Sequence, residues 1–242
     1  MIIAKKKPIE EIIASLTGDK SVFIVGCGEC ATVTETGGEK EVAEMKAALE
    51  AAGKKVVGVD MVAAGCQELD LKRILRAHKE AAEETDAFLV LSCGAGTQAV
   101  REGTDKHVVP GTDSLFLGNI KRSGNYEEKC SLCGKCVLDD YGAICPVTRC
   151  AKGLLNGPCG GTNHGKCEVD PDKDCAWVLI YDQLKKEGRA DKLTRVHPPK
   201  DWNVVARPGR VAPAKEEPAK ETAGAAKGTA GAVKEVAGNK KP

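Results

Sequence analysis

The sequence has few aromatic residues, no excess of charge and no long apolar run. Only two Trp, three Tyr and three Phe occur among 242 residues, so a surface that stacks nucleic-acid bases is not expected. The 36 basic and 35 acidic residues are interspersed and leave a formal net charge of +1, which does not favour a polyanionic partner. Because no run of about 18 apolar residues and no secretory signal are apparent, we expect a cytoplasmic protein without a membrane span.

Cysteine is the residue that this chain has in excess. It occurs 12 times, and eight of these residues lie between Cys130 and Cys175. A chain of this length does not need disulfides in order to fold, and a cytoplasmic chain keeps its thiols reduced. Reduced cysteines at two-residue spacings are typical metal ligands. The pattern therefore favours metal sites over disulfides.

Residues 1–122 are predicted to form an α/β domain. Short apolar runs predict strands over residues 21–26, 55–60 and 87–93, and amphipathic stretches predict helices over residues 41–53 and 70–84. A short helix near 98–102 and a strand near 114–117 are expected to complete the domain. Strands that alternate with helices of this length predict a Rossmann-like or flavodoxin-like parallel sheet.

Residues 123–206 are predicted to form a small cysteine-rich metal-binding domain. Glycine, cysteine and proline are dense between residues 124 and 175, and no core is expected there, so metal binding should supply much of the folding free energy. A C-terminal helix follows Cys175, with Trp177, Ile180, Tyr181 and Leu184 on its apolar face. That face is predicted to pack on the first domain or, as the alternative, on a partner subunit.

Residues 207–242 have a different composition from the rest of the chain. Ala, Gly, Lys, Glu, Val and Pro dominate, and there is no aromatic residue. Such a composition cannot bury a core. We therefore predict a low-complexity, disordered tail.

Four cysteines of the first domain follow its predicted strands. Cys27 and Cys30 come after the first strand, Cys66 after the second, and Cys93 ends the third. Ligands of open parallel sheets bind at this carboxyl edge, and four thiolates there would hold a [4Fe-4S] cluster. Neighbouring glycines would let backbone N–H groups approach the cofactor: Gly26, Gly28, Gly65, Gly94 and Gly96. The alternative interpretation is that Cys66 and Cys93 are small buried hydrophobic residues.

Two other activities are compatible with the same residues. The run 26–31 matches G-x-G-x-x-A after a strand, and Asp60 ends the next strand, as in dinucleotide-binding folds. However, Cys27 and Cys30 would crowd the pyrophosphate. The same two cysteines form C-x-x-C, a dithiol redox motif, although Glu29 would raise rather than lower a thiol pKa. NAD binding and dithiol chemistry are therefore alternatives to the cluster.

The second domain contains a stronger metal motif. Cys130, Cys133 and Cys136 are spaced C-x2-C-x2-C, as in bacterial ferredoxins, although eight residues rather than three separate them from Cys145-Pro146. Four more cysteines follow: Cys150, Cys159, Cys167 and Cys175. Eight ligands fill two tetrahedral sites, but the pairing cannot be read from the spacing, because the Cys-Pro ligand of two-cluster ferredoxins belongs to the other cluster.

Zinc is the alternative metal in this domain. Four thiolates, or three thiolates and His164, would form a structural zinc site. The isolated His107 and His197 are predicted to be surface residues. We expect two [4Fe-4S] clusters in the chain, with a third cluster or one structural zinc ion as alternatives.

The cysteine-rich residues resemble a known family. Residues 153–161 (GLLNGPCGG), 165–169 (GKCEV) and 175–177 (CAW) are similar to the methylenetetrahydrofolate reductase C-terminal domain family. The chain to about residue 202, including VGCGECA and LSCGAG, resembles the small, MetV-type iron–sulfur subunit of the two-subunit reductases of acetogenic anaerobes. The resemblance implies a partner, a flavin-containing (β/α)8 catalytic subunit that carries the folate site, and a separate electron-donor protein or complex.

These observations lead to one functional hypothesis with two alternatives. The chain is predicted to pass electrons through its clusters to or from the partner's flavin, within the one-carbon metabolism of the Wood–Ljungdahl pathway, as the resemblance implies. No general base, nucleophile or open metal position is evident, so the chain is interpreted as a non-catalytic subunit of an oxidoreductase. The alternatives are a structural zinc scaffold of the same complex and an independent dithiol or NAD oxidoreductase.

Overall fold

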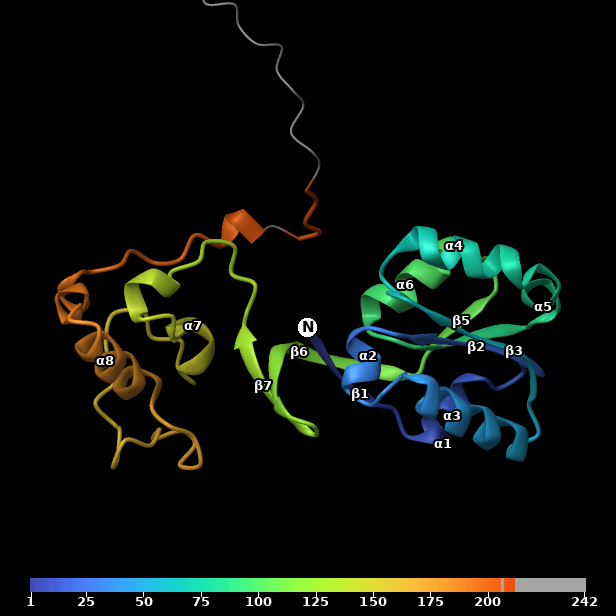
Figure 1. Cartoon of the computed structure of the whole chain (residues 1–242), viewed down its shortest axis with the longest axis horizontal. Helices are drawn as coiled ribbons and strands as arrows, with labels where there is room; N and C mark the ends of the chain where they lie inside the picture. The colour runs from blue at the N-terminus through green and yellow to red at the C-terminus, as the bar shows by residue number, and fades with distance from the viewer. Residues whose placement is uncertain (206, 212–242) are drawn as a thin grey trace, which may run out of the picture. The chain divides into compact units, whose positions relative to one another are not determined.

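A computed structural model describes residues 1–205 and 207–211 and contains a four-stranded parallel sheet (Figure 1). The strands are β2 (Ser21–Cys27), β3 (Lys55–Val62), β4 (Ala87–Leu91) and β5 (His107–Pro110), in the order β3-β2-β4-β5. All pairings are parallel. The mixed α/β class and the first three strands are therefore confirmed. The fourth strand, β5, was not predicted.

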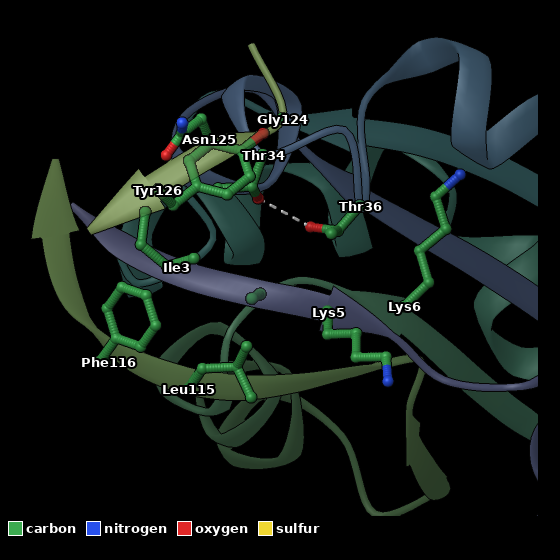
Figure 2. A pocket seen from close by; sticks show the side chains of 11 residues that line it. Ile3, Lys5, Lys6, Thr34, Thr36, Leu115, Phe116, Gly124, Asn125 and Tyr126 are labelled. Carbon is green, nitrogen blue, oxygen red and sulfur yellow. Dashed lines mark hydrogen bonds between the residues drawn. The ribbon is translucent and has the colours of Figure 1, made fainter. Parts of the chain in front are cut away.

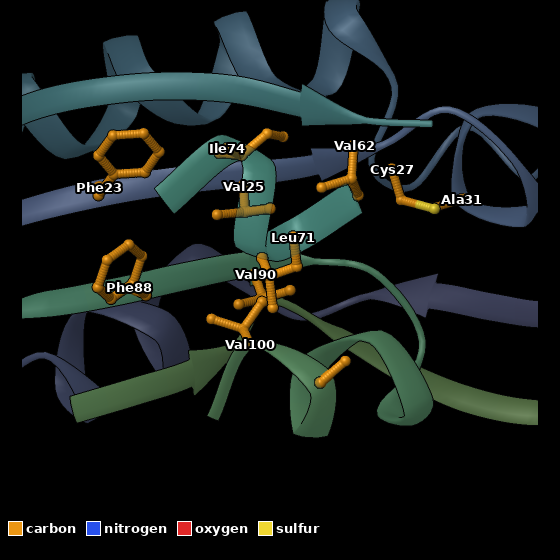
Figure 3. Packing of buried hydrophobic residues seen from close by; sticks show 11 residues of the cluster. Phe23, Val25, Cys27, Ala31, Val62, Leu71, Ile74, Phe88, Val90 and Val100 are labelled. Carbon is orange, nitrogen blue, oxygen red and sulfur yellow. The ribbon is translucent and has the colours of Figure 1, made fainter. Parts of the chain in front are cut away.

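Helices cover both faces of this sheet, as a parallel sheet requires. One face is covered by α1 (Ile9–Ser15) and α3 (Glu39–Ala51), and the other by α4 (Glu68–Ala77), α5 (Lys79–Glu84) and α6 (Gly94–Gly103). Side chains alternate along β2: Val22 and Ile24 pack under α1 and α3, whereas Phe23 and Val25 pack with Phe88 under α4 (Figure 3). Two buried layers therefore fix the register of β2.

The long helix predicted over residues 70–84 is wrong, because the structure breaks it into α4 and α5 at His78. The backbone of His78 leaves the helical region, with φ −111° and ψ 35°. Its side chain turns inward instead: Nε2 lies 2.7 Å from Asp60 Oδ2, and the ring meets Phe23 edge-on at 5.5 Å. These two contacts favour the break over a continuous helix.

A second, antiparallel sheet contains the strand that was predicted near residues 114–117. This sheet has the order β1-β6-β7, with β1 (Ile2–Lys6), β6 (Thr112–Arg122) and β7 (Asn125–Cys130). The expectation that this strand completes the parallel sheet is wrong, because β6 pairs with the N-terminal β1. The β6–β7 hairpin spans the predicted domain boundary between residues 122 and 123, which remains a prediction.

The cysteine-rich segment contains short elements around a small core. They are η1 (Leu138–Tyr141), α7 (Pro146–Arg149), α8 (Ala176–Lys186), η2 (Ala190–Thr194) and η3 (Trp202–Val205). The C-terminal helix is thus confirmed as α8, but its expected packing on the first domain is wrong. Its buried residues Trp177, Ile180 and Leu184 pack on Tyr141 of the same segment. Tyr181, predicted on the same face, is exposed instead. The segment therefore has a core of its own, contrary to expectation.

Two further predictions concern the C-terminal tail and membrane-spanning helices. The predicted tail lies, from residue 212 onward, outside the described residues. Within residues 1–205 and 207–211, no helix combines the length and apolar character needed to cross a membrane.

Candidate metal centres

Three strand ends bring the N-terminal cysteines to one edge of the parallel sheet. Cys27 is the last residue of β2, Cys30 is the first residue of α2 (Cys30–Val33), and Cys93 caps α6 directly after β4. Cys66 lies in the loop after β3, where the N–H of Gly65 donates to Cys27 Sγ at 3.4 Å. Cys27 is buried, but Cys66 is exposed and Cys93 is half-buried. The last two are therefore not core hydrophobic residues.

The glycines of this edge allow the loops to pack closely. A Cβ added to Gly96 would lie 2.3 Å from Ser92 Oγ, and one added to Gly65 would lie 2.8 Å from the same atom. The loops that contain Cys66 and Cys93 thus meet at Ser92. Gly26 packs against Met61, and Gly28 approaches the Ala63 carbonyl.

Gly94 differs from the other four glycines because its surroundings are open. Its N–H donates to Ser114 Oγ at 2.9 Å, and an added Cβ would meet nothing closer than 3.8 Å. Contact of any of the five glycines with a cofactor remains a prediction.

The arrangement does not favour dinucleotide binding at the same edge. Asp60 is engaged by His78 and is not free for a ribose. The helix after the glycine motif, α2, has only four residues, so it offers little dipole to a pyrophosphate. Cluster ligation by these cysteines stays a prediction.

The C-x2-C-x2-C motif forms an exposed turn at the end of β7. Leu132 and Gly134 adopt left-handed conformations, with φ of 54° and 77°. This bend directs the N–H of Leu132 to Cys130 Sγ, at 3.4 Å. Backbone N–H groups that point at sulfur are the donors that stabilise and tune iron–sulfur clusters. The turn can therefore present thiolates together with backbone donors.

Cys145 lies beside this turn at the start of α7. Thr148 of α7 links them, because its Oγ1 is 2.9 Å from Ser131 Oγ and 3.6 Å from Cys145 Sγ. Pro146 occupies the first helical position, where its missing N–H costs no hydrogen bond.

The remaining four cysteines line a single small cavity. Its lining residues include Cys150, Cys159, Cys167 and Cys175, and its volume is about 20 Å³. Trp177 closes one wall and is held in place by its indole N–H, which donates to the Leu154 carbonyl at 3.2 Å. The exposed His164 is not among the lining residues.

A zinc ion and an iron–sulfur cluster require different arrangements of the candidate cysteine ligands. Among the described residues, no three His, Cys, Asp or Glu side chains are arranged to share one metal ion. A tetrahedral zinc site needs every sulfur at about 2.3 Å from one ion. A cubane holds its thiolates at separate corners, farther from one another. The four cysteines around one cavity supply thiol ligands that suit either group, an iron–sulfur cluster or a zinc ion.

Two exposed ion pairs brace the loop between Cys167 and Cys175. Lys166 Nζ lies 2.8 Å from Asp174 Oδ1, and Lys173 Nζ lies 2.9 Å from Asp170 Oδ2. The hydrogen bonds that the ammonium groups donate to the carboxylates lower the pKa of both aspartates and raise the pKa of both lysines. Because the pairs are exposed, they add little to stability.

One histidine near this region is more buried than its sequence context predicts. His197, predicted to be a surface residue, stacks on Tyr141 with ring centroids 5.0 Å apart. Its Nε2 is buried and has no hydrogen-bond partner in the described part of the chain. No signal in the sequence indicated this burial, because the contact joins residues 56 positions apart.

An open groove of about 430 Å³ runs beside β1 but offers no comparable chemistry (Figure 2). The hydroxyls of Thr34 and Thr36 bond to each other at 3.0 Å, and Lys6 lies 3.3 Å from Glu44. Several of its polar groups are thus already paired, and no cysteine lines it.

The fold and these sites define an α/β protein with a cysteine-rich C-terminal segment. Residues 109–203 match the family model described as Methylene-tetrahydrofolate reductase C terminal. The match includes all eight cysteines of the segment and confirms the resemblance inferred from residues 153–177. Comparisons with curated proteins and with solved structures gave no match. The MetV-type assignment and the N-terminal half lie beyond what the family match covers.

Proposed function

We propose that this chain is an iron–sulfur electron-transfer subunit that works with the catalytic subunit of a methylenetetrahydrofolate reductase. One coincidence supports the proposal most: the family match covers the same stretch in which four cysteines surround one cavity. The family match links the chain to this reductase, and the cysteines supply the ligands for a redox group.

The residues present fit such a group. A [4Fe-4S] cluster, when bound, supplies one-electron transfer at a potential that the protein tunes. The chain supplies thiolates as ligands, and the N–H groups of Leu132 and Gly65 point at cysteine sulfur. Donors of this kind favour the more negative, reduced state. Trp177, only 6% exposed, keeps water from the cavity wall.

The proposal also includes the partner proteins and the topology of the parallel sheet. The catalytic partner is a flavin-containing (β/α)8 subunit that carries the folate site, and a further protein or complex donates electrons. Within residues 1–205 and 207–211, the parallel sheet has four strands and does not form such a barrel. Its order, β3-β2-β4-β5, is that of the first four strands of a flavodoxin-like sheet.

Anaerobic reconstitution of the full chain tests this function. We expect iron and acid-labile sulfide to bind, with a broad visible absorbance that dithionite bleaches. The reduced chain should then reduce the flavin of a methylenetetrahydrofolate reductase catalytic subunit, and a Cys133→Ser variant should do so more slowly. A matched Ser131→Ala variant should keep its iron. Absence of iron and sulfide, or iron without flavin reduction, would contradict the proposal.

A structural zinc scaffold is the second candidate. The cavity volume of about 20 Å³ favours it, because that space admits one water-sized group and its walls must move apart for a cubane. Zinc without iron or sulfide in the anaerobically purified chain would select this candidate.

A further inference from the structure

We infer that the eight cysteines of the segment form two separate thiolate sites, divided by α7. One site comprises Cys130, Cys133, Cys136 and Cys145; the other comprises Cys150, Cys159, Cys167 and Cys175. The inference rests on the proposed metal binding, but not on which thiophilic centre, an iron–sulfur cluster or a zinc ion, occupies each site.

Contacts among the loops hold the second group together. Lys152, two residues after Cys150, pairs with Glu168, which directly follows Cys167. Glu168 also packs against Gly161 so closely that an added Cβ would lie 1.2 Å from its carboxylate. The loops that contain Cys150, Cys159 and Cys167 therefore converge on the Glu168 side chain.

The fourth member joins this group through backbone hydrogen bonds. The N–H of Cys175 donates to the Gly165 carbonyl at 2.7 Å, and the N–H of Cys167 donates to the Lys173 carbonyl at 2.9 Å. These bonds place the two cysteines on adjacent stretches of backbone. All four then line the cavity beneath Trp177.

Cys145 is held apart from that cavity. It does not line the cavity, and its thiol instead contacts Thr148, the residue that bonds to Ser131 of the C-x2-C-x2-C turn. The Cys-Pro ligand of two-cluster ferredoxins joins the other cluster. Here the contacts of Thr148 favour the uncrossed arrangement.

The helix α7 separates the two sites. Cys145 precedes it and Cys150 follows it, and at 1.5 Å of rise per residue the two lie roughly 7 Å apart along its axis. The N–H of Arg149 donates to the Cys145 carbonyl, and the N–H of Cys150 donates to the Pro146 carbonyl, so both cysteines are part of one hydrogen-bonded turn. A single rigid turn thus directs neighbouring cysteines into different sites and keeps the sites close.

Thiol footprinting of the full, metal-loaded chain tests this division. In Cys145→Ser, iodoacetamide should modify Cys130, Cys133 and Cys136 at least tenfold faster than in the wild-type chain, while the four cavity cysteines stay protected. In Cys150→Ser, Cys159, Cys167 and Cys175 should instead be modified at least tenfold faster than in the wild-type chain. The cysteines of the other site should stay protected. The variants are matched, because they change the same atom at the two ends of α7. Peptide mass spectrometry measures each cysteine separately, so a folding defect would appear as loss of protection everywhere.

Metal analysis of double variants provides the second readout. Cys130→Ser/Cys145→Ser should lose one centre, as each single variant does, whereas Cys145→Ser/Cys150→Ser should lose both. Loss of two centres in the first pair, or of one in the second, overturns the division. If the chain held two zinc centres that were lost in this pattern, the electron-transfer function would be rejected and the division into two sites retained. If the chain bound no metal, the function and the division would both be rejected.

Discussion

Two aromatic side chains anchor the loop between two of the cavity cysteines. Tyr141 donates its hydroxyl to the Leu155 carbonyl at 2.8 Å, and Trp177 donates its indole N–H to the neighbouring Leu154 carbonyl. The two rings meet edge-on at 5.7 Å. In a chain with so few aromatic residues, this pair supplies much of the apolar area of the segment and fixes the course of the chain from Cys150 to Cys159.

The first prediction concerns Tyr141→Phe. Loss of the hydrogen bond should lower the free energy of unfolding by about 1 kcal/mol at neutral pH. Burial raises the pKa of Tyr141 from 10.0 to about 12, so the folded chain favours the neutral phenol. Its stabilising effect is complete below pH 10 and is lost as the pH rises toward 12, because the unfolded chain releases the proton first. Urea unfolding between pH 7 and 12 measures both effects.

The matched control is Tyr126→Phe. Its hydroxyl makes an exposed hydrogen bond of 3.4 Å to the Val33 carbonyl, so we expect a change below about 0.5 kcal/mol. If both variants lowered the free energy of unfolding equally, the hydrogen bond from Tyr141 to Leu155 would contribute no more than the exposed one.

At the scale of elements, η3 covers the C-x2-C-x2-C turn. A Cβ added to Gly134 would lie 2.5 Å from Val204 Cγ2 and 2.7 Å from Val205 Cγ1. Lys200 adds a hydrogen bond from Nζ to the Lys135 carbonyl. The strand β7, which leads into the turn, is braced by Glu127, whose bonds to Lys121 and Lys129 lower its pKa to about 2. The turn is therefore supported by β7, which precedes it in the chain, and by η3, which follows it.

The second prediction compares two glycines. Gly134→Ala should destabilise the chain more than Gly124→Ala, because both residues have left-handed backbones, with φ of 77° and 75°, but only Gly134 has neighbours within 4 Å. The left-handed backbone costs an alanine about 1–2 kcal/mol at either position, and displacement of η3 adds to this at Gly134. Chemical denaturation gives the free energies, and limited proteolysis at residues 198–205 reports the displacement. Identical values would exclude the contact with η3.

At the scale of the molecule, the parallel sheet and the cysteine-rich segment differ in the size of their apolar cores. The parallel sheet buries two apolar layers that include Phe23, Phe88, Leu49 and Leu89. The described part of the cysteine-rich segment has a smaller core cluster, made of the buried residues Tyr141, Trp177, Ile180 and Leu184. A core of this size supplies little of the free energy needed to order the surrounding loops, so we predict that bound metal contributes to their stability.

The third prediction follows from this difference. Removal of metal with a chelator should increase amide hydrogen exchange in residues 130–175, while β2 and β4 keep the protection that their buried layers provide. Phe88→Ala tests the opposite case. Loss of the buried ring should lower the stability of the sheet by about 3–5 kcal/mol and leave hydrogen exchange in the cysteine loops unchanged. Hydrogen exchange with mass spectrometry measures both. Simultaneous loss of protection in sheet and loops after chelation would indicate one cooperative unit.

Local signals in the sequence determined the strand ends and the metal motif. An apolar run followed by glycine and cysteine marks a buried strand and its carboxyl end, and parallel pairing then brings Cys27, Cys66 and Cys93 to one edge. C-x2-C-x2-C is readable for the same reason, since its ligands lie within one turn of backbone. The family resemblance was also readable from residues 153–177.

Only the tertiary structure decided what depends on residues far apart in the chain. The partner of β6 is the N-terminal β1, and the break at His78 depends on Asp60 and Phe23, so periodicity within either segment does not reveal them. The grouping of the last eight cysteines is of the same kind, because Glu168 and Thr148 bring the loops together. Spacing indicated which residues are candidate ligands, whereas contacts between loops support the proposal of which of them share a site.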